Sequence, residues 1–425
     1  MKKLDLCDSF SAEGTDLNEF YEWINSIVES TSIVQMDTSK IRLLPVIDGC
    51  ILADILPRYM QSKEPNLLED RQCRKLYMME IKENQIFKAT PPSLATVSLD
   101  KILKRGGTEQ IFHEARTQSK LFIAYNGKLY FTSASLYESL CARANLKGDA
   151  ARDTSIEKIA FIMRRFRRKP QTVKALIRTF PHNGISKIMV IGSSRYQYIP
   201  QTFFSKLIER IHITLGEMPQ CYKWAINSFI STVNLEFPLL GKRLQQKFNL
   251  HDLFIPGICL VSSDTHDASI SARATWRVGK SVVIGRSIYM KHMPNANLQG
   301  FFTEIKNGIL LKYSDFYYQL GQFEDVVVKN PESVLPRIYS VLGIDRAVGK
   351  RKSDKILQEQ MQKYVGIETC SAYELVANIL KLPGAYPLEG SPADKFKRAV
   401  YEALFLTDKH FQSPKKTYNK VERAG

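Results

Sequence analysis

The sequence predicts an α+β protein: a central antiparallel β-meander with flanking helices, followed by a helical C-terminal region. Residues 257–285 contain three runs rich in β-branched residues, separated by turn signals, which is the pattern of a meander. Helical periodicity precedes and follows this stretch. The 425 residues, of which 44% are apolar, exceed what one hydrophobic core usually covers, so we expect two or more packed units.

Charge divides the chain into three expected regions. Residues 1–100 hold 11 Lys and Arg against 16 Asp and Glu, and predict an acidic, mainly helical N-terminal region. Residues 101–310 predict a basic α+β core, and residues 311–425 a helical C-terminal region with a frayed tail. The net charge is +17, and residues 151–200 alone hold 11 basic and 2 acidic residues. A field focused in this way attracts polyanions.

The first expected element is a helix at residues 16–29. Its apolar side chains recur at helical spacing and predict a stripe that faces a core: Leu17, Phe20, Trp23, Ile24 and Ile27. The strongest local prediction follows at Asn126 and Gly127, a dipeptide that accepts positive φ at both turn positions. Apolar runs flank this dipeptide, so residues 121–132 predict a β-hairpin.

Residues 155–169 predict an amphipathic helix that ends at Pro170 and turns its cations to solvent. Its expected buried side is formed by Ile156, Ile159, Ile162, Met163 and Phe166. Residues 172–180 are expected to form a second short helix, residues 187–196 a strand, and a later helix is expected to end at about Gly216. The middle run of the meander alternates, with a polar and basic face made of Ser269, Ser271, Arg273, Thr275 and Arg277.

The cationic end of the helix at residues 155–169 is the main candidate site. Closely spaced cations can meet successive phosphates of a nucleic acid and release its counterions. The predicted phosphate clamp consists of Arg164, Arg165, Arg167, Arg168 and Lys169. The same run is also compatible with an ordinary solvated face, and in a eukaryotic cell with a nuclear import signal.

Further residues are expected to extend this site. The predicted cationic members are Lys174, Arg178, Arg195, Arg273 and Arg277. Tyr196 and Tyr198 lie beside Arg195 in the sequence and are candidates to stack on the bases of a single strand. Tyrosines on strands are also common at the edges of a core, and both interpretations stay open.

Two segments resemble motifs that are found in enzymes. Gly279-Lys280-Ser281 matches the end of a phosphate loop, but position 274 is alanine where the first glycine belongs, and the following residues are strand-like. Asp264, His266 and Asp267 could bind a divalent ion, which keeps a metal-dependent nuclease as an alternative. The remaining histidines have no zinc-site spacing. We therefore expect no enzyme and no cofactor.

Three segments, in this order, resemble the family of phage- and plasmid-encoded proteins known as domain of unknown function nine-three-two. They are KIMVIGSSRYQYIP at residues 187–200, GICLVSSDTHDASISARATW at residues 257–276, and SAYELVANIL at residues 371–380. The resemblance covers roughly residues 170–410. The organisation of that family resembles single-strand annealing proteins of the Rad-fifty-two and phage Red-beta type, which form rings or filaments and lay single-stranded DNA in a basic groove. The resemblance thus implies strand annealing without covalent chemistry.

These observations predict a nucleic-acid-binding protein of a phage or other mobile element, which binds or anneals single-stranded DNA in replication or recombination. RNA stays possible as a partner, and a homo-oligomer stays open. The seven cysteines are scattered singly and predict a reducing compartment. No signal peptide or membrane-spanning run is expected, so the predicted location is cytoplasmic, or nuclear in a eukaryote. The third alternative is a non-catalytic structural or host-interaction protein whose basic face meets an acidic partner.

Overall fold

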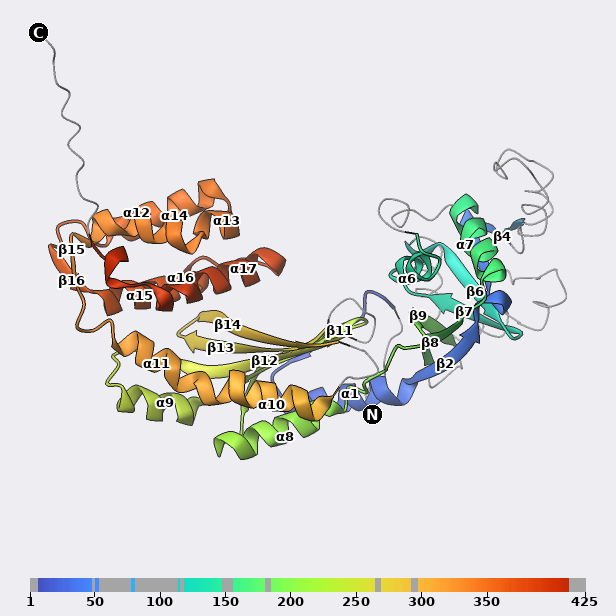
Figure 1. The fold of residues 1–425 in the computed structure, drawn as a ribbon, viewed down its shortest axis with the longest axis horizontal. Helices are drawn as coiled ribbons and strands as arrows, with labels where there is room; N and C mark the ends of the chain where they lie inside the picture. Colours follow the sequence, from blue (N-terminus) through green and yellow to red (C-terminus); the bar gives the residue numbers. More distant parts are fainter. Residues whose placement is uncertain are drawn as a thin grey trace, which may run out of the picture.

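The computed structural model describes a curved molecule with two lobes, each built on one β-sheet (Figure 1). The described residues are 7–47, 50–52, 78–80, 114, 118–146, 156–179, 185–263, 269–291 and 297–412. We call the lobe formed by β2 to β9 with helices α6 and α7 the hairpin lobe, and the lobe formed by β1, α1 and residues 203–412 the meander lobe. Helix α1 (Leu17–Ser30) continues directly into β2 (Thr31–Asp37), so one uninterrupted segment joins the two lobes.

The hairpin lobe contains a mixed sheet that has eight strands within the described residues. Its strands, in spatial order, are β2, β8 (Thr172–Thr179), β9 (Ser186–Ser193), β7 (Lys128–Thr132), β6 (Leu121–Tyr125), β3 (Arg42–Ile47), β4 (Cys50–Leu52) and β5 (Met78–Glu80). The pairing of β7 with β9 is parallel, and the other described pairings are antiparallel. The expected hairpin is confirmed, because Asn126 (φ 48°) and Gly127 (φ 72°) form the turn between β6 and β7.

Residues 172–180 were expected to be helical, and this prediction is wrong. They contain β8, which lies between β2 and β9 and pairs antiparallel with both. Thr172, Val173, Ile177 and Thr179 are β-branched and fit a pleated surface better than a helix. The partner strand β2 lies more than a hundred residues earlier in the chain, so the pairing that decides this conformation is not visible locally.

The meander lobe contains an antiparallel sheet, six-stranded in the described part of the chain. Its strands are, in spatial order, β1 (Ser11–Gly14), β10 (Gln220–Asn227), β11 (Ile230–Glu236), β12 (Ile255–Ser263), β13 (Ile270–Val278) and β14 (Ser281–Met290). The predicted meander is confirmed as β12, β13 and β14. Gly279 takes a positive φ of 56° in the turn that joins β13 to β14, so the Gly279-Lys280-Ser281 segment connects two strands.

Helices cover both faces of the meander sheet (Figure 1). One face carries α8 (Phe203–Leu215), α9 (Pro238–Lys247), α10 (Leu298–Gly308), the short η4 (Leu310–Lys312) and α11 (Tyr313–Gly321). The other face carries α15 (Ala372–Leu380), α16 (Leu382–Ala385) and α17 (Gly390–Tyr401), with α12 (Pro331–Leu342), α13 (Ile344–Val348) and α14 (Lys350–Gln362) outside them. The expected helical C-terminal region is confirmed, and it also contains β15 (Val327–Lys329), β16 (Thr369–Ser371), η5 (Glu402–Phe405) and η6 (Asp408–His410).

Residues from the first hundred contribute strands to both lobes. Strand β1 pairs with β10 in the meander lobe, whereas β2 and β3 pair with β8 and β6 in the hairpin lobe. The helix expected at residues 16–29 is confirmed as α1, and Phe20, Ile24 and Ile27 are buried on its inner side. The expected boundary at residue 100 lies outside the described residues, so the three-region division stays a prediction. Across the described ranges, no helix has the length and apolar character needed to cross a membrane.

Candidate nucleic-acid interface

Helix α7 (Ile156–Arg168) carries the predicted phosphate clamp, and its inner face anchors it to the hairpin lobe. Ile159, Ile162, Met163 and Phe166 are 0–2% exposed and pack with residues of α6 (Leu136–Arg143) and of the sheet. Each such burial stabilises a fold by about 1.5–3 kcal/mol. The inner face is therefore occupied by the core, and the opposite face is left to solvent, as the periodicity predicts.

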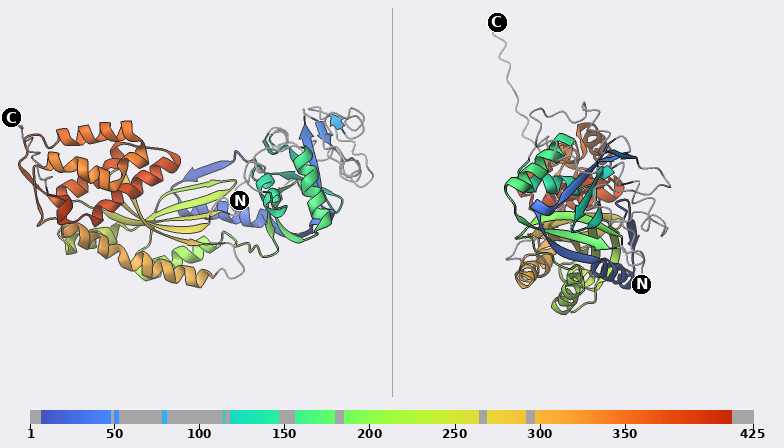
Figure 2. Two further views of the ribbon diagram at one scale, coloured as in Figure 1. Left: turned by 45° about the horizontal axis from the view of Figure 1, so that its top comes forward. Right: turned by 90° about the vertical axis from the view of Figure 1, so that its right-hand side faces the viewer.

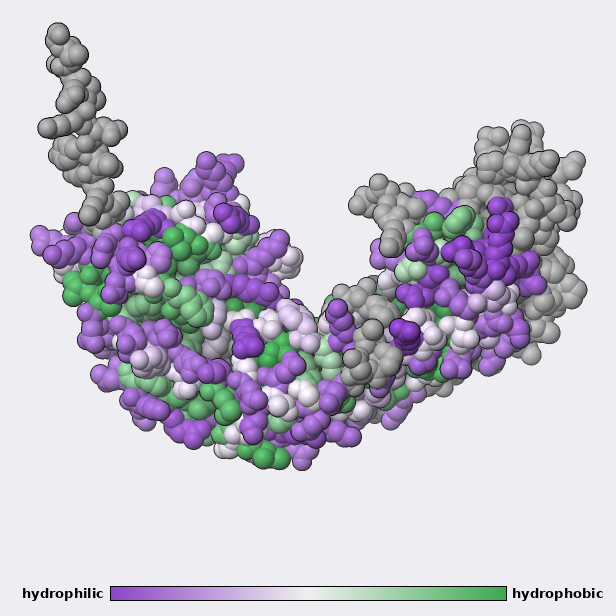
Figure 3. Space-filling model, viewed as in Figure 1, coloured by the Kyte–Doolittle hydropathy of each residue, from purple (hydrophilic) through white to green (hydrophobic). Residues whose placement is uncertain are grey.

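The outer face of α7 combines cations with an exposed aromatic ring. Arg167, Arg168 and Lys169 are exposed, Arg164 and Arg165 are half-buried, and the ring of Phe161 is 45% exposed. Phe161, Arg165 and Arg168 are spaced by four and three residues, so they follow one another along the same side of the helix. Figure 3 shows strongly hydrophilic side chains gathered where Figure 1 places α7. This surface presents positive charge beside an apolar ring.

Among the described residues, most of this charge is not neutralised by acids. Arg165, Arg167, Arg168 and Lys169 form no ion pair with any residue that the structure describes. Part of the clustering has a structural reason, because Arg167 and Arg168 lie in the last turn, where cations favour the negative end of the helix dipole. A bound anion would relieve the remaining mutual repulsion, and a phosphate backbone carries such charge.

Two further cations lie near the end of α7. The Gln171 side chain donates to the carbonyl oxygen of Arg143 at the end of α6 (2.9 Å), and its backbone N–H donates to Oγ1 of Thr38 (3.0 Å). These bonds bring the last turn of α6 and the short η1 (Thr38–Lys40) against the end of α7. Arg143 is half-buried and Lys40 is exposed. Sequence reasoning missed Phe161, Lys40 and Arg143, of which only Phe161 had a local signal, namely its spacing from Arg165.

Several predicted extensions of the site are structural residues. Arg178 is 3% exposed, and its Nη1 donates to the carbonyl oxygen of Ser228 (2.6 Å), which ties β8 to the meander lobe. Tyr196 is 2% exposed, because its ring packs on Gly192, where a Cβ would come within 2.6 Å of the tyrosine. The predictions that Arg178 contacts phosphate and that Tyr196 stacks on a base are thus corrected, since burial removes both side chains from solvent.

The predicted site residues near Tyr196 differ in exposure and in contacts. Tyr198 is half-buried and packs against the small apolar cluster of Leu176, Met189 and Val190, so its ring is partly used by the fold. Lys174 is half-buried, and its Nζ donates to the carbonyl oxygen of Tyr196 (2.8 Å). Arg195 is exposed. Of the predicted extensions in the hairpin lobe, Arg195 keeps the exposure that a contact with phosphate requires.

The two arginines of the meander are paired with acids. Nη1 of Arg273 lies 2.8 Å from Oδ2 of Asp394 on α17. Arg277 binds Glu236 on β11 in a bidentate way, with Nε to Oε1 at 2.6 Å and Nη2 to Oε2 at 2.7 Å, and it also lies over the Tyr222 ring. The hydrogen bonds that Arg277 donates to Glu236 raise the pKa of Arg277. Both arginines are half-buried, and Ser271 of the expected polar face is buried, so this face is not a freely charged surface.

The structure does not bring all predicted site residues together. The α7 cations lie on the hairpin lobe, whereas Arg273 and Arg277 belong to the sheet of the other lobe (Figures 1 and 2). The cations that were expected to share one groove therefore lie on two different lobes, and contact of either group with a nucleic acid stays a prediction. Asp264, His266 and Asp267 lie outside the described residues. Among the residues that are described, no group of three or more His, Cys, Asp and Glu side chains could hold a metal ion.

Comparisons of the chain with family models, with curated proteins and with solved structures found no match. The resemblance to the domain of unknown function nine-three-two stays an expectation from the three segments that carry it. We therefore infer function from the chemistry of the surfaces themselves.

Proposed function

We propose that this protein binds the phosphate backbone of a nucleic acid, with single strands favoured, through the outer face of α7. The observation that carries the proposal is a cluster of four cations at the end of a helix whose other face is fixed in a core: Arg165, Arg167, Arg168 and Lys169. None of them forms an ion pair with a described residue, and all except the half-buried Arg165 are exposed. A rigidly anchored helix holds these charges at constant spacing. Binding then needs little ordering of the protein and gains from the release of counterions.

The exposed Phe161 ring is the reason for favouring single strands. In a duplex the faces of the bases are stacked on each other, whereas an unpaired base can stack on an aromatic side chain. Phe161 shares one side of α7 with Arg165 and Arg168, so a base on the ring has its phosphates within reach of guanidinium groups. Arg164, half-buried beside Phe161, completes the proposed contact surface.

The wider role that we propose is strand binding or annealing in the replication or recombination of a phage or other mobile element, inside the host cell and without covalent chemistry. The support for this role is the three-segment resemblance in the sequence together with the α7 surface. A homo-oligomer that lines up several α7 surfaces fits the same role, because each copy offers only a short cationic stretch.

A salt titration with matched variants tests the proposal. The test variant replaces Arg165, Arg167, Arg168 and Lys169 by alanine, and the control replaces the exposed Lys350, Arg351, Lys352 and Lys355 of α14 by alanine. Both lose four positive charges from a helix, so the net charge of the two variants is equal. Affinity for a labelled single-stranded oligonucleotide is measured between about 50 and 200 mM salt.

The expected slope of log affinity against log salt falls by roughly 3 in the α7 variant, at about 0.7 for each lost phosphate contact, and stays unchanged in the α14 control. An equal loss in both variants would show that net charge, and not the α7 surface, drives binding. An unchanged slope in the α7 variant would remove α7 from the interface.

A further inference from the structure

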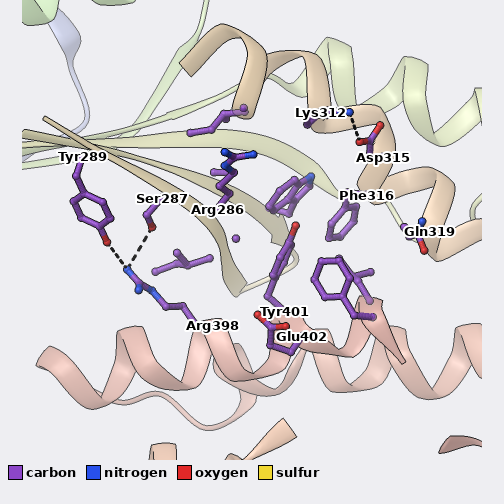
Figure 4. Close-up of a pocket in the computed structure, with 18 residues that line it drawn as sticks. Arg286, Ser287, Tyr289, Lys312, Asp315, Phe316, Gln319, Arg398, Tyr401 and Glu402 are labelled. Carbon is purple, nitrogen blue, oxygen red and sulfur yellow. Dashed lines mark hydrogen bonds and ion pairs between the residues drawn. The ribbon is translucent and has the colours of Figure 1, made fainter. Parts of the chain in front are cut away.

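A pocket lies at the free edge of the meander sheet, between β14 on one side and α11 and α17 with η5 on the other (Figure 4). Its volume is about 860 Å³, within the range of roughly 300–1,000 Å³ that is usual for small-molecule sites. None of the α7 residues contributes to its lining. The pocket therefore offers a binding chemistry that is separate from the proposed interface.

One end of the pocket is cationic. Arg286 of β14 is exposed and Arg398 of α17 is half-buried, and neither forms an ion pair with a described residue. Nη2 of Arg398 lies 3.4 Å from both the Ser287 hydroxyl and the Tyr289 hydroxyl, and its Nε is buried with no hydrogen-bond acceptor among the described groups. The hydrogen bond from Arg398 lowers the pKa of Tyr289. Arg398 thus meets two hydroxyls and makes this end of the pocket positive, whereas the Arg286 guanidinium lies against Gly308 of α10 and points away from Arg398 (Figure 4).

The middle of the pocket is aromatic. The Trp276 ring stacks on Phe316 (centroids 4.6 Å apart, planes at 10°) and on Tyr401 (5.2 Å, 20°). Gly285 permits this packing, since a Cβ there would lie 2.6 Å from the Trp276 ring. Trp276 is 3% exposed, and its Nε1 is buried without a hydrogen-bond acceptor in the described part of the chain. A buried indole N–H normally has a partner, so this wall lacks one acceptor.

The other end of the pocket accepts hydrogen bonds. Asp315, Gln319 and Glu402 lie there, away from Arg398 and Tyr289 (Figure 4). Asp315 is paired with Lys312 at 3.1 Å, in an exposed contact that water weakens. Burial, with smaller contributions from the charges of Glu402 and Asp315, raises the pKa of Tyr401 to about 12. The pocket is thus ordered as cations, then aromatic rings, then carboxylate and amide oxygens.

We propose that this pocket binds a nucleotide, with its phosphate on Arg398 beside the Ser287 and Tyr289 hydroxyls, its base on the partly exposed Tyr401 ring, and donor groups of the base toward Asp315 and Glu402. The order of the three zones matches phosphate, planar ring and exocyclic N–H groups. A fatty acid also has an anion and an apolar part, but its tail would end among carboxylates, which is unfavourable. The nucleotide is either free or the end of a strand.

Direct binding measurements on the full chain test the proposal. Calorimetry with AMP, GMP, CMP and UMP is compared with adenosine, with ribose 5-phosphate and with inorganic phosphate alone. At least one mononucleotide is expected to bind on the order of tenfold more tightly than each fragment, because only the whole molecule fills all three zones. Equal affinity for inorganic phosphate, or no binding of any of the four nucleotides, overturns the proposal.

A trinucleotide with a 5′-phosphate identifies the source of the nucleotide. Tighter binding of the trinucleotide than of the mononucleotide assigns the pocket to a strand end, and the reverse order assigns it to a free nucleotide. Either order supports the nucleotide chemistry, whereas competition by a saturated fatty acid with equal affinity contradicts it.

Variants locate the site. Arg398→Gln is expected to weaken nucleotide binding on the order of tenfold, and Arg286→Gln, which changes an exposed side chain that points away from Arg398, is expected to leave it unchanged. The control is Arg243→Gln, an exposed arginine of α9 that does not line the pocket. Thermal unfolding checks that each variant is folded. Full affinity in Arg398→Gln rules out this site.

Mononucleotide binding in the pocket can be tested separately from strand binding by α7. The α7 alanine variant is expected to bind the mononucleotide normally, and Arg398→Gln is expected to keep the salt-dependent binding of a long single strand. Loss of mononucleotide binding in the α7 variant would place the nucleotide on α7 and overturn the pocket proposal.

Discussion

The outer face of α7 and the polar face of β13 contain the same residue type, but only one of them presents free charge. Arg167 and Arg168 on α7 are exposed and form no ion pair within the described chain, whereas Arg273 and Arg277 on β13 are half-buried and bound by Asp394 and Glu236. The difference arises from the neighbours. On the β13 face, Arg273 is paired with Asp394 of α17, and Glu236 of β11 reaches Arg277 from beyond β12. The α7 face has no element over it in the described structure. Positive charge in a sequence indicates a binding surface only where the fold leaves it uncovered.

The largest expected effect is on the free energy of unfolding, and it distinguishes the buried face of α7 from its exposed face. Phe166 is 1% exposed and Phe161 is 45% exposed, one and a half turns apart on the same helix. Phe166→Ala is expected to lower the free energy of unfolding by about 3–5 kcal/mol, because it leaves a cavity in the core. Urea unfolding measures this loss. A loss below about 1 kcal/mol would mean that α7 is not anchored as described.

Phe161→Ala is the matched change on the outer face. It is expected to leave the free energy of unfolding within about 0.5 kcal/mol of the original value. Affinity for a single strand is expected to fall by about 1–3 kcal/mol, while affinity for a duplex of the same length stays nearly constant. Fluorescence anisotropy with both oligonucleotides measures the difference. Equal losses for the two would show that the ring does not stack on bases.

Breaking the Glu236–Arg277 pair on the β13 face is expected to have a third, smaller effect, on the free energy of unfolding. Glu236 is 10% exposed at its side chain and Arg277 is 26% exposed, so the pair is only partly shielded from water. Glu236→Gln is expected to lower the free energy of unfolding by about 1–2 kcal/mol, since Arg277 then keeps a weaker, neutral partner. A double-mutant cycle with Arg277→Gln measures the coupling. A coupling near zero would contradict the pairing that distinguishes β13 from α7.

The smallest expected effect is on binding by the meander arginines. Because Arg273 and Arg277 already hold carboxylates, Arg273→Gln with Arg277→Gln is expected to change the salt slope by less than about 0.7, the contribution of one phosphate contact. The comparison variant carries Arg167→Gln with Arg168→Gln and is expected to lose about 1.4. If the β13 pair loses as much as the α7 pair, both faces contact the strand and the distinction between them fails.

Local patterns predicted a large part of the fold. The hairpin at Asn126 and Gly127, the amphipathic α7 and the β12 to β14 meander all follow from turn chemistry and from periodicity within short segments. The error at β8 has the opposite cause. Its conformation depends on pairing with β2 and β9. Considered alone, the run of Lys174, Ala175 and Leu176 consists of residues with high helix propensity.

The candidate site was less predictable than the fold, for the same reason. The exposure of Arg167 and Arg168 follows from the helical period, which is local. The partners of Arg273 and Arg178 do not, because Asp394 is 121 residues away and Ser228 is 50 residues away. Burial of Tyr196 depends on its packing over Gly192 in a turn of the chain. Sequence patterns thus locate charge, and only the tertiary structure shows which charges are already neutralised.

Hydroxyl-radical footprinting tests the central claim most directly, because each face contains one exposed aromatic ring as a reporter. Phe161 lies on the α7 face at 45% exposure, and Tyr222 lies beneath Arg277 on the meander lobe at 47%. Oxidation of both rings is measured by mass spectrometry with and without a saturating single-stranded oligonucleotide. If the α7 face holds the strand, Phe161 is expected to be protected and Tyr222 to stay as reactive as before. Protection of Tyr222 with Phe161 unchanged would contradict binding by α7.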